Sequence, residues 1–238
     1  MVTTSVVSTR TLPIVAIDGP AGAGKSTVAR KVADALGFVL VDTGAMYRSV
    51  ALASKRAGIA WSDGAAVAEL AHSLVHAHAL TFERDPILGV RVKLSGEDIS
   101  DAIRTPDIAQ GASLVSAHGD VRHALLEIQR AAGRNGGVVL EGRDIGTVVF
   151  PDAEAKFFLT ASPEMRAKRR HAELVAKGST ATFEETLFDV KRRDAQDEGR
   201  EVAPLKKAES AMLVDSTGLS IEETVAKMLA EVKRVAAR

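Results

Sequence analysis

The sequence predicts an α/β fold in which helices flank a central parallel sheet of about five strands. Short apolar runs alternate along the chain with segments whose apolar residues recur at helical spacing, the pattern of parallel strands joined by helical crossovers. A glycine-rich segment connects the first apolar run to the first helical segment. The alternation is interrupted between residues 61 and 106 and then resumes, which indicates an insertion into one domain.

The first part of the alternation predicts two strands and two helices. Ile14–Ile17 is apolar and too short for a helix, so we expect a buried strand. Apolar residues at four-residue spacing predict a helix over Lys25–Leu36. A second strand over Phe38–Val41 and a second helix over Ala45–Ala57 follow.

The interrupted region predicts a helix and an antiparallel strand pair. The helix is expected over Ala65–His76, and the strands over Ala79–Glu83 and Val90–Leu94. In the second strand apolar residues alternate with arginine and lysine, which is typical of a half-exposed strand.

The chain then returns to strands and helices. We expect a helix over Val121–Ala132, strands over Val138–Glu141 and Ala155–Leu159, and a helix starting at Ser162 and Pro163, because proline suits the first helical position.

The last part of the chain contains a charged segment, a strand and a helix. Lys177–Lys207 is dense in charge and contains glycine, so we expect a mobile peripheral segment. A strand is expected over Ala211–Val214, and a capping-box pattern from Ser220 to Glu223 predicts the start of the final helix.

The expected organisation is a flexible leader over residues 1–12 followed by one domain over residues 13–238. The leader lacks the pattern of a signal peptide. No apolar run reaches the roughly 18 residues that span a bilayer. We therefore expect a cytoplasmic protein with no membrane partner.

Composition narrows the classes of function. Lys and Arg together number 31, as do Asp and Glu, and this balance argues against a nucleic-acid-binding protein. With no cysteine, disulfides and thiol catalysis are excluded. Nothing in the composition suggests an obligate partner, so we expect a monomer.

The glycine-rich segment GPAGAGKS, residues 19–26, matches the phosphate-binding pattern G-x-x-x-x-G-K-[ST]. It follows a predicted strand and opens a predicted helix, so backbone N–H groups can converge on a phosphate. Lys25 is expected to reach the β- and γ-phosphates of ATP, and the Ser26 hydroxyl to hold Mg²⁺. The predicted ATP-binding residues are Gly19, Pro20, Ala21, Gly22, Ala23, Gly24, Lys25, Ser26 and Thr27.

Such a loop occurs in many nucleotide-binding proteins, so the rest of the sequence must identify the class. The chain has no N-K-x-D string, which argues against a switch GTPase. Three charged clusters could serve a second anionic substrate: DTGAMYR at Asp42–Arg48, EGRDIGTVVFPDA at Glu141–Ala153, and RRDAQDEGREVAPL at Arg192–Leu205. The first two follow predicted strands, where ligands of open parallel sheets bind.

In their order and in their residues, these motifs resemble those of bacterial-type cytidylate kinases, which are P-loop nucleoside monophosphate kinases. The similarity extends over residues 13–235. It implies in-line transfer of a phosphoryl group from ATP to CMP or dCMP, with Mg²⁺ as cofactor and CDP or dCDP as product. It also implies a P-loop kinase fold with a nucleoside-monophosphate-binding insertion near residues 61–106 and a helical lid near residues 177–207.

The resemblance assigns residue roles, and the chemistry of the side chains agrees with them. Arginine binds phosphate oxygens with two parallel N–H groups, and a carboxylate can accept from the cytosine amine. The resemblance implies Thr43 as a CMP-binding residue. It also implies Tyr47, Arg48, Arg143 and Arg200 at the phosphate, Ser113, Arg122 and Asp144 at the cytosine edge, and Asp197 with Arg193 at the ribose. The implied catalytic residues are Lys25, Arg143, Arg193 and Arg200. Gln196 departs from the basic residue expected in some relatives, so no ATP contact is assigned there.

Several alternatives stay open at this stage. Asp42 and Asp144 are both candidates to support the water shell of Mg²⁺. Each arginine could instead form a structural ion pair. The acceptor could be UMP, another nucleotide, or a metabolite such as shikimate or dephospho-CoA. A nonenzymatic ATP-binding module is the remaining class.

Overall fold

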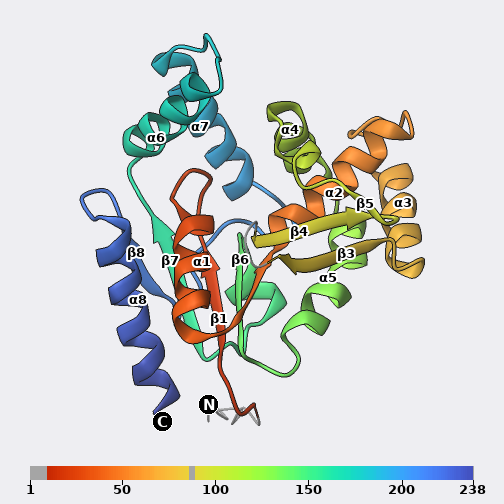
Figure 1. The fold of residues 1–238 in the computed structure, drawn as a ribbon. Helices are drawn as coiled ribbons and strands as arrows, with labels where there is room; N and C mark the ends of the chain where they lie inside the picture. Colours follow the sequence, from red (N-terminus) through yellow and green to blue (C-terminus); the bar gives the residue numbers. More distant parts are fainter. Residues whose placement is uncertain (1–9, 86–88, 238) are drawn as a thin grey trace. The chain divides into compact units, whose positions relative to one another are not determined.

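The computed structural model describes residues 10–85 and 89–237 (Figure 1). The chain divides into two compact units: Asp42–Ala132 forms one, and the chain on both sides of it forms the other. The expected insertion, residues 61–106, lies inside the first unit. Of the expected leader, residues 1–9 lie outside the described residues.

A five-stranded sheet forms the centre of the flanking unit, in the order β2-β6-β1-β7-β8 (Figure 1). Strand β1 runs parallel to both β6 and β7, and β7 runs parallel to β8. The strands are β1 (Ile14–Asp18), β2 (Val39–Asp42), β6 (Val138–Gly142), β7 (Ala155–Thr160) and β8 (Met212–Asp215). The predicted central parallel sheet is confirmed.

Among its described residues, the same unit contains four α-helices. They are α1 (Lys25–Leu36), α6 (Pro163–Ala176), α7 (Phe183–Glu198) and α8 (Ile221–Ala236). Helix α1 has the predicted bounds, between glycines at 24 and 37 that both adopt left-handed conformations. Ser162 caps α6 through its side chain, and the predicted capping box starts α8.

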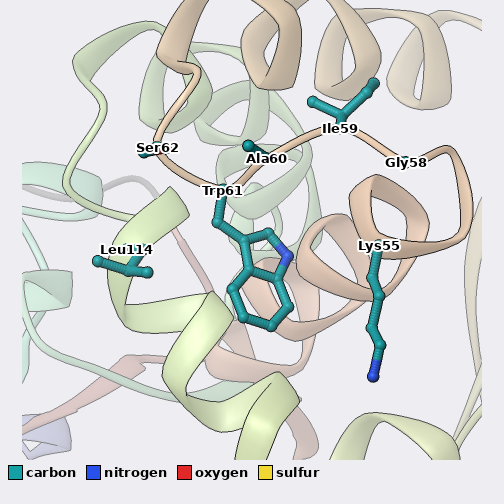
Figure 2. A pocket seen from close by; sticks show the side chains of 7 residues that line it. All are labelled: Lys55, Gly58, Ile59, Ala60, Trp61, Ser62 and Leu114. Atoms are coloured by element: carbon teal, nitrogen blue, oxygen red, sulfur yellow. The ribbon is translucent and has the colours of Figure 1, made fainter.

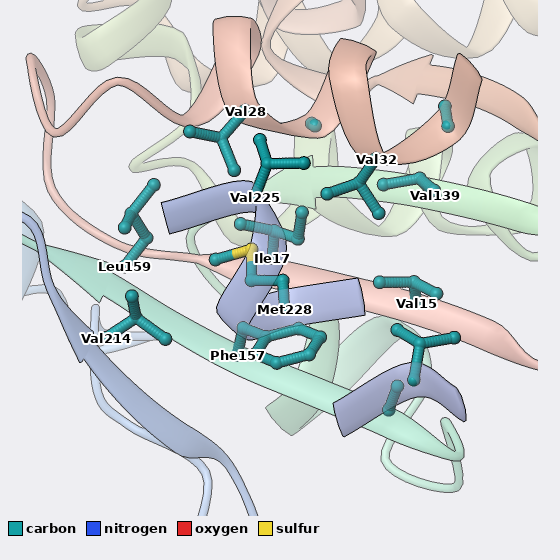
Figure 3. Close-up of a cluster of buried hydrophobic side chains, with 14 of the residues drawn as sticks. Val15, Ile17, Val28, Val32, Val139, Phe157, Leu159, Val214, Val225 and Met228 are labelled. Atoms are coloured by element: carbon teal, nitrogen blue, oxygen red, sulfur yellow. The ribbon is translucent and has the colours of Figure 1, made fainter. Parts of the chain in front are cut away.

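The core of this unit fixes the strand ends that carry the predicted site. Phe157 of β7 and Ile17 of β1 are buried against Val28 of α1 and Met228 of α8 (Figure 3). Strands such as β1 and β6 are buried at every residue, which explains their continuous apolar runs.

The charged segment near residues 177–207 contains a regular helix, α7. Thr182 and Glu185 form a capping box at its start, and α7 packs against α6. The helix ends at Glu198, so Arg200 lies beyond its C-terminus.

The unit Asp42–Ala132 combines helices with a small antiparallel sheet of order β3-β4-β5. Its elements are α2 (Thr43–Arg56), α3 (Gly64–His76), β3 (Leu80–Asp85), β4 (Gly89–Leu94), β5 (Glu97–Asp98), a 3₁₀ turn at Ala102–Arg104, α4 (Pro106–Val115) and α5 (Gly119–Gly133). The antiparallel pair β3 and β4 confirms the prediction, whereas helix α4 was not predicted. Among the described residues, no helix is both long and apolar enough to cross a bilayer.

Candidate active site

The phosphate-binding loop joins β1 to α1, and its backbone requires glycine. Gly19 has φ +150°, and a Cβ there would lie 1.9 Å from the carbonyl oxygen of Leu159. Gly22 and Gly24 have φ +76° and +89°. Side chains at these positions would be strained, and at Gly19 one would also clash with β7.

Side chains hold several carbonyl groups of this loop. Lys25 Nζ donates to the carbonyl of Pro20 over 2.8 Å. Arg166 Nη1 donates to the carbonyl of Ala21 over 3.1 Å, and Ser216 Oγ donates to that of Ala23 over 3.4 Å. These bonds stabilise the unusual loop conformation, because buried carbonyl groups need partners.

Lys25 is buried, with 6% of its surface exposed. Burial lowers the pKa of its amine to about 7, and the positive charge of Arg143 adds to the decrease. Carboxylates at Asp18, Glu141 and Asp197 act in the opposite direction. A site that keeps a lysine and an arginine this close is suited to a polyanion.

Ser26 is exposed and lies beside a buried carboxylate. Its Oγ donates to Oε2 of Glu141 over 2.9 Å, and Glu141 is 4% exposed at the end of β6. Hard oxygen donors of this kind fit Mg²⁺. Within the described residues no cluster of three or more His, Cys, Asp or Glu side chains could hold a metal.

Glu141 is a residue that the sequence analysis did not assign to metal support. Of the two carboxylates named for it, Asp42 accepts from Ala45 N at the start of α2 and forms an ion pair of 2.7 Å with Arg48. Asp144 is buried beyond the end of β6, and its role stays a prediction.

Asp18 is a second residue that sequence reasoning missed. Its carboxylate accepts from the backbone N–H groups of Ile145 at 2.8 Å and Gly146 at 2.7 Å. Burial raises the pKa of Asp18 to about 6, although these two hydrogen bonds act to lower it. The end of β1 is thereby fixed to the turn that follows Arg143 and Asp144.

A buried cluster joins the loop after β6 to the end of α7. Arg143 Nε donates to Oδ2 of Asp197 over 2.8 Å, and Arg200 Nη2 donates to Oδ1 of the same carboxylate. Burial acts to raise the pKa of Asp197, but the charges of Arg143, Arg200 and Arg193 outweigh it, and the pKa is lowered. The structure therefore brings Arg143 of the second motif together with Asp197 and Arg200 of the third.

The remaining predicted acceptor residues belong to the unit Asp42–Ala132. The Arg122 guanidinium lies 5.3 Å from the centre of the Tyr47 ring and donates to the carbonyl of Ser116. Thr43 is the first residue of α2 and is buried. Ser113 on α4 is 6% exposed, and its buried hydroxyl has no hydrogen-bond partner among the described residues. A buried hydroxyl without a hydrogen-bond partner destabilises the fold, and a ligand that hydrogen-bonds to it would remove this cost.

The same unit also has a pocket of about 440 Å³ around Trp61 (Figure 2). It contains none of the predicted site residues. The Trp61 ring donates to the carbonyl of Ala51 over 2.9 Å, and a Cβ on Gly111 would lie 2.5 Å from that ring. Trp61 is therefore half-buried between α2 and α4, and it also lines the pocket.

Comparison with known proteins identifies the family of the chain. The family described as Cytidylate kinase matches residues 15–234. The cytidylate kinase of Geobacter sp. (strain M21) is 57% identical over 220 residues, which cover 92% of each chain. The cytidylate kinase of Geobacter sulfurreducens is 55% identical over 215 residues, which cover 90% of each chain. The chain therefore belongs to the cytidylate kinase family and is a phosphotransferase.

Proposed function

We propose that this enzyme transfers the γ-phosphoryl group of ATP to CMP or dCMP in the presence of Mg²⁺, forming ADP and CDP or dCDP. The observation that carries the proposal is the cluster in which Asp197 holds Arg143 and Arg200, with Arg143 also acting electrostatically on Lys25. Arg143, Lys25 of the phosphate-binding loop and Arg200 of the lid segment thus belong to one electrostatic network.

The reaction needs no protein nucleophile, because an oxygen of the acceptor phosphate attacks the γ-phosphorus and the bond to the β-phosphate oxygen breaks. Catalysis then consists of positioning and charge neutralisation. Lys25 and the loop N–H groups bind the β- and γ-phosphates. Arg143, Arg200 and Arg48 bind the acceptor phosphate, and Arg193 adds positive charge from α7.

Asp197 keeps the arginines in place. A guanidinium that already has one fixed partner loses less rotamer freedom when it binds phosphate. The ribose contacts are also assigned to Asp197 and Arg193. When CMP binds, Asp197 must therefore accept from a ribose hydroxyl, either in place of one of its arginines or in addition to them.

Cytosine is read by Ser113, Arg122 and Asp144. The support for this assignment is the buried Ser113 hydroxyl and the position of Arg122 over Tyr47. An Asp144 carboxylate would accept from the exocyclic amine of cytosine, and uracil offers no donor there.

The Mg²⁺ that this chemistry uses would be held by Ser26, with Glu141 orienting the hydroxyl or a bound water. When bound, the ion neutralises charge on the β- and γ-phosphate oxygens. The pairing of an exposed hydroxyl with a buried carboxylate supports this choice.

The test is an ADP-release assay with ATP and Mg²⁺, run in parallel with CMP, dCMP, UMP, AMP and GMP. Turnover with CMP and dCMP at least about 10²-fold above the others in kcat/KM supports the proposal, since hydrogen-bonding sites discriminate strongly. Equal use of UMP contradicts the cytosine assignment. Absence of turnover with every monophosphate, in protein that binds ATP, contradicts the acceptor and leaves the nonenzymatic alternative.

Lys25→Met is the control for the donor side and should remove turnover with every acceptor.

The monomeric state and the cytosolic location remain predictions. Light scattering on a size-exclusion column tests the first of these.

A further inference from the structure

Arg166 is a buried arginine for which the proposed reaction has no role. It lies on α6 with 3% of its surface exposed. Its guanidinium donates four hydrogen bonds, to the carbonyls of Ala161 and Ala21 and to both oxygens of Asp194. The two bonds to Asp194 measure 2.8 and 2.6 Å and form a bidentate ion pair.

Arg166 contacts the phosphate-binding loop directly. Its Nη1 donates to the carbonyl of Ala21, and a Cβ on Gly22 would lie only 3.3 Å from the Cβ of Arg166. The loop therefore cannot change shape at these residues without moving the side chain of Arg166 or breaking its hydrogen bond.

Asp194 connects the same guanidinium to α7. It precedes Asp197 by three residues on this helix, so the two carboxylates lie on neighbouring positions of one face. Asp197 in turn holds Arg143 and Arg200. Helix α7 is thus tied at Asp194 to the phosphate-binding loop and at Asp197 to the end of β6.

We infer that Arg166 and Asp194 are positioning residues. When a nucleoside triphosphate binds in the loop, they transmit the resulting movement to α7, and so to the arginines held by Asp197. Arg166 remains bonded to both partners because an unpaired buried guanidinium is strongly unfavourable. A shift of the Ala21 carbonyl when phosphates bind therefore moves α7 with it. The inference rests on the proposed function for the binding of ATP in the loop, and it does not depend on the identity of the acceptor.

The test measures α7 directly and uses no acceptor. The chain has no cysteine, and Phe188 on α7 is 67% exposed, so Phe188→Cys gives a single site for an environment-sensitive fluorophore. The labelled protein is saturated with a non-hydrolysable ATP analogue and Mg²⁺, and the change in emission is recorded.

Asp194→Asn in this background should reduce the emission change at saturation at least about fivefold, the lower range of measured coupling between sites. Saturation with analogue removes any effect of altered affinity. The matched control is Asp189→Asn, five residues earlier on α7, whose ion pair with Arg192 is more than half exposed. The control should keep the full emission change.

A second variant guards against destabilisation, because Asp194→Asn leaves Arg166 buried without its charge partner. Arg166→Met combined with Asp194→Leu removes both charges, a change that folded proteins tolerate better. It should also lose the emission change while melting cooperatively.

A full emission change in either variant, or no change in the labelled parent, overturns the inference. A separate measurement, CMP turnover by the parent protein, tests the proposed function. If that turnover is absent while the fluorescence still responds to the ATP analogue, the proposed function fails and the inference about α7 does not.

Discussion

Arg143 donates to the carboxylate of Asp197 over 2.8 Å, joining the loop after β6 to the last turn of α7. The side chain of Asp197 is 2% exposed, whereas that of Arg143 is 21% exposed. The carboxylate is therefore the fixed member of the pair, and the arginine is the member that a ligand can reach. This division suits a carboxylate that positions cations and an arginine that binds phosphate.

Asp197→Asn should destabilise the fold by about 3 kcal/mol, because it leaves two arginines without their buried anion. It should also lower kcat/KM for CMP by about 10²-fold, since the arginines lose their fixed orientation. Urea unfolding and steady-state kinetics measure the two effects. The control Asp189→Asn alters an exposed pair on the same helix and should cost under about 1 kcal/mol. Equal stability of the two variants would contradict the role of Asp197.

Asp18→Asn should change how stability depends on pH. The folded-state pKa of Asp18 is raised to about 6, above the value of about 3.9 in unfolded chains. Between these values the folded state binds the extra proton, so this group makes the free energy of unfolding fall as pH rises from 4 to 6. Removing it should make the slope over that range less negative by up to about 1.4 kcal/mol per pH unit. An unchanged slope in urea titrations from pH 4 to 7 would contradict the burial argument.

Gly19→Ala should prevent nucleotide binding and destabilise the protein by more than about 2 kcal/mol, because the new Cβ meets the Leu159 carbonyl at a positive φ. Thermal unfolding and binding of a fluorescent ATP analogue measure both losses. Gly218→Ala is the matched control, since a Cβ there has no neighbour within 4 Å and the φ is not in the left-handed region. That variant should stay within about 0.5 kcal/mol of the parent.

Local patterns predicted the elements that build the phosphate site. The strand before the loop and the bounds of Lys25–Leu36 follow from apolar spacing and from glycines at both ends. Helix α4, Pro106–Val115, was missed although Thr105 and Pro106 are a recognisable helix start. Gly111 is a poor helix former inside this segment, and the Trp61 ring occupies the space that a side chain at position 111 would need.

The ion-pair network could not be predicted from the sequence. Arg166 and Asp194 read as charges on solvated helix faces, because alternating charge is what exposed helices show. Only the packing of α6 on α7 buries them together. In the sequence, Asp18 likewise looks like the end of a strand. The two backbone N–H groups that bond to it lie more than 120 residues further along the chain.

Ser26→Ala removes the proposed ligand, and Glu141→Gln removes the charge of the group that supports it. Each should raise the Mg²⁺ concentration for half-maximal activity by about tenfold or more. Because Ser26 donates to Glu141, the effects should not add, and the double variant should resemble the stronger single variant. Activity titrated with Mg²⁺ at fixed ATP measures this. Additive effects would show that the two side chains act independently of one another.

Asp144→Ala should raise the KM for CMP by about 10- to 100-fold, the worth of one or two hydrogen bonds to a base edge, while the affinity for ATP changes less than about twofold. The reason for the difference is that the proposed partner of Asp144 is the cytosine amine, whereas the ATP phosphates are proposed to bind Lys25 and the N–H groups of the loop after β1. Asp152→Ala is the control from the same motif, because its side chain is half-exposed and pairs with Arg10. The variant should also lose its preference for CMP over UMP, since the carboxylate is the group that accepts from the cytosine amine. If both nucleotides weaken equally, Asp144 only positions Arg143, and cytosine is read by Ser113 and Arg122 alone.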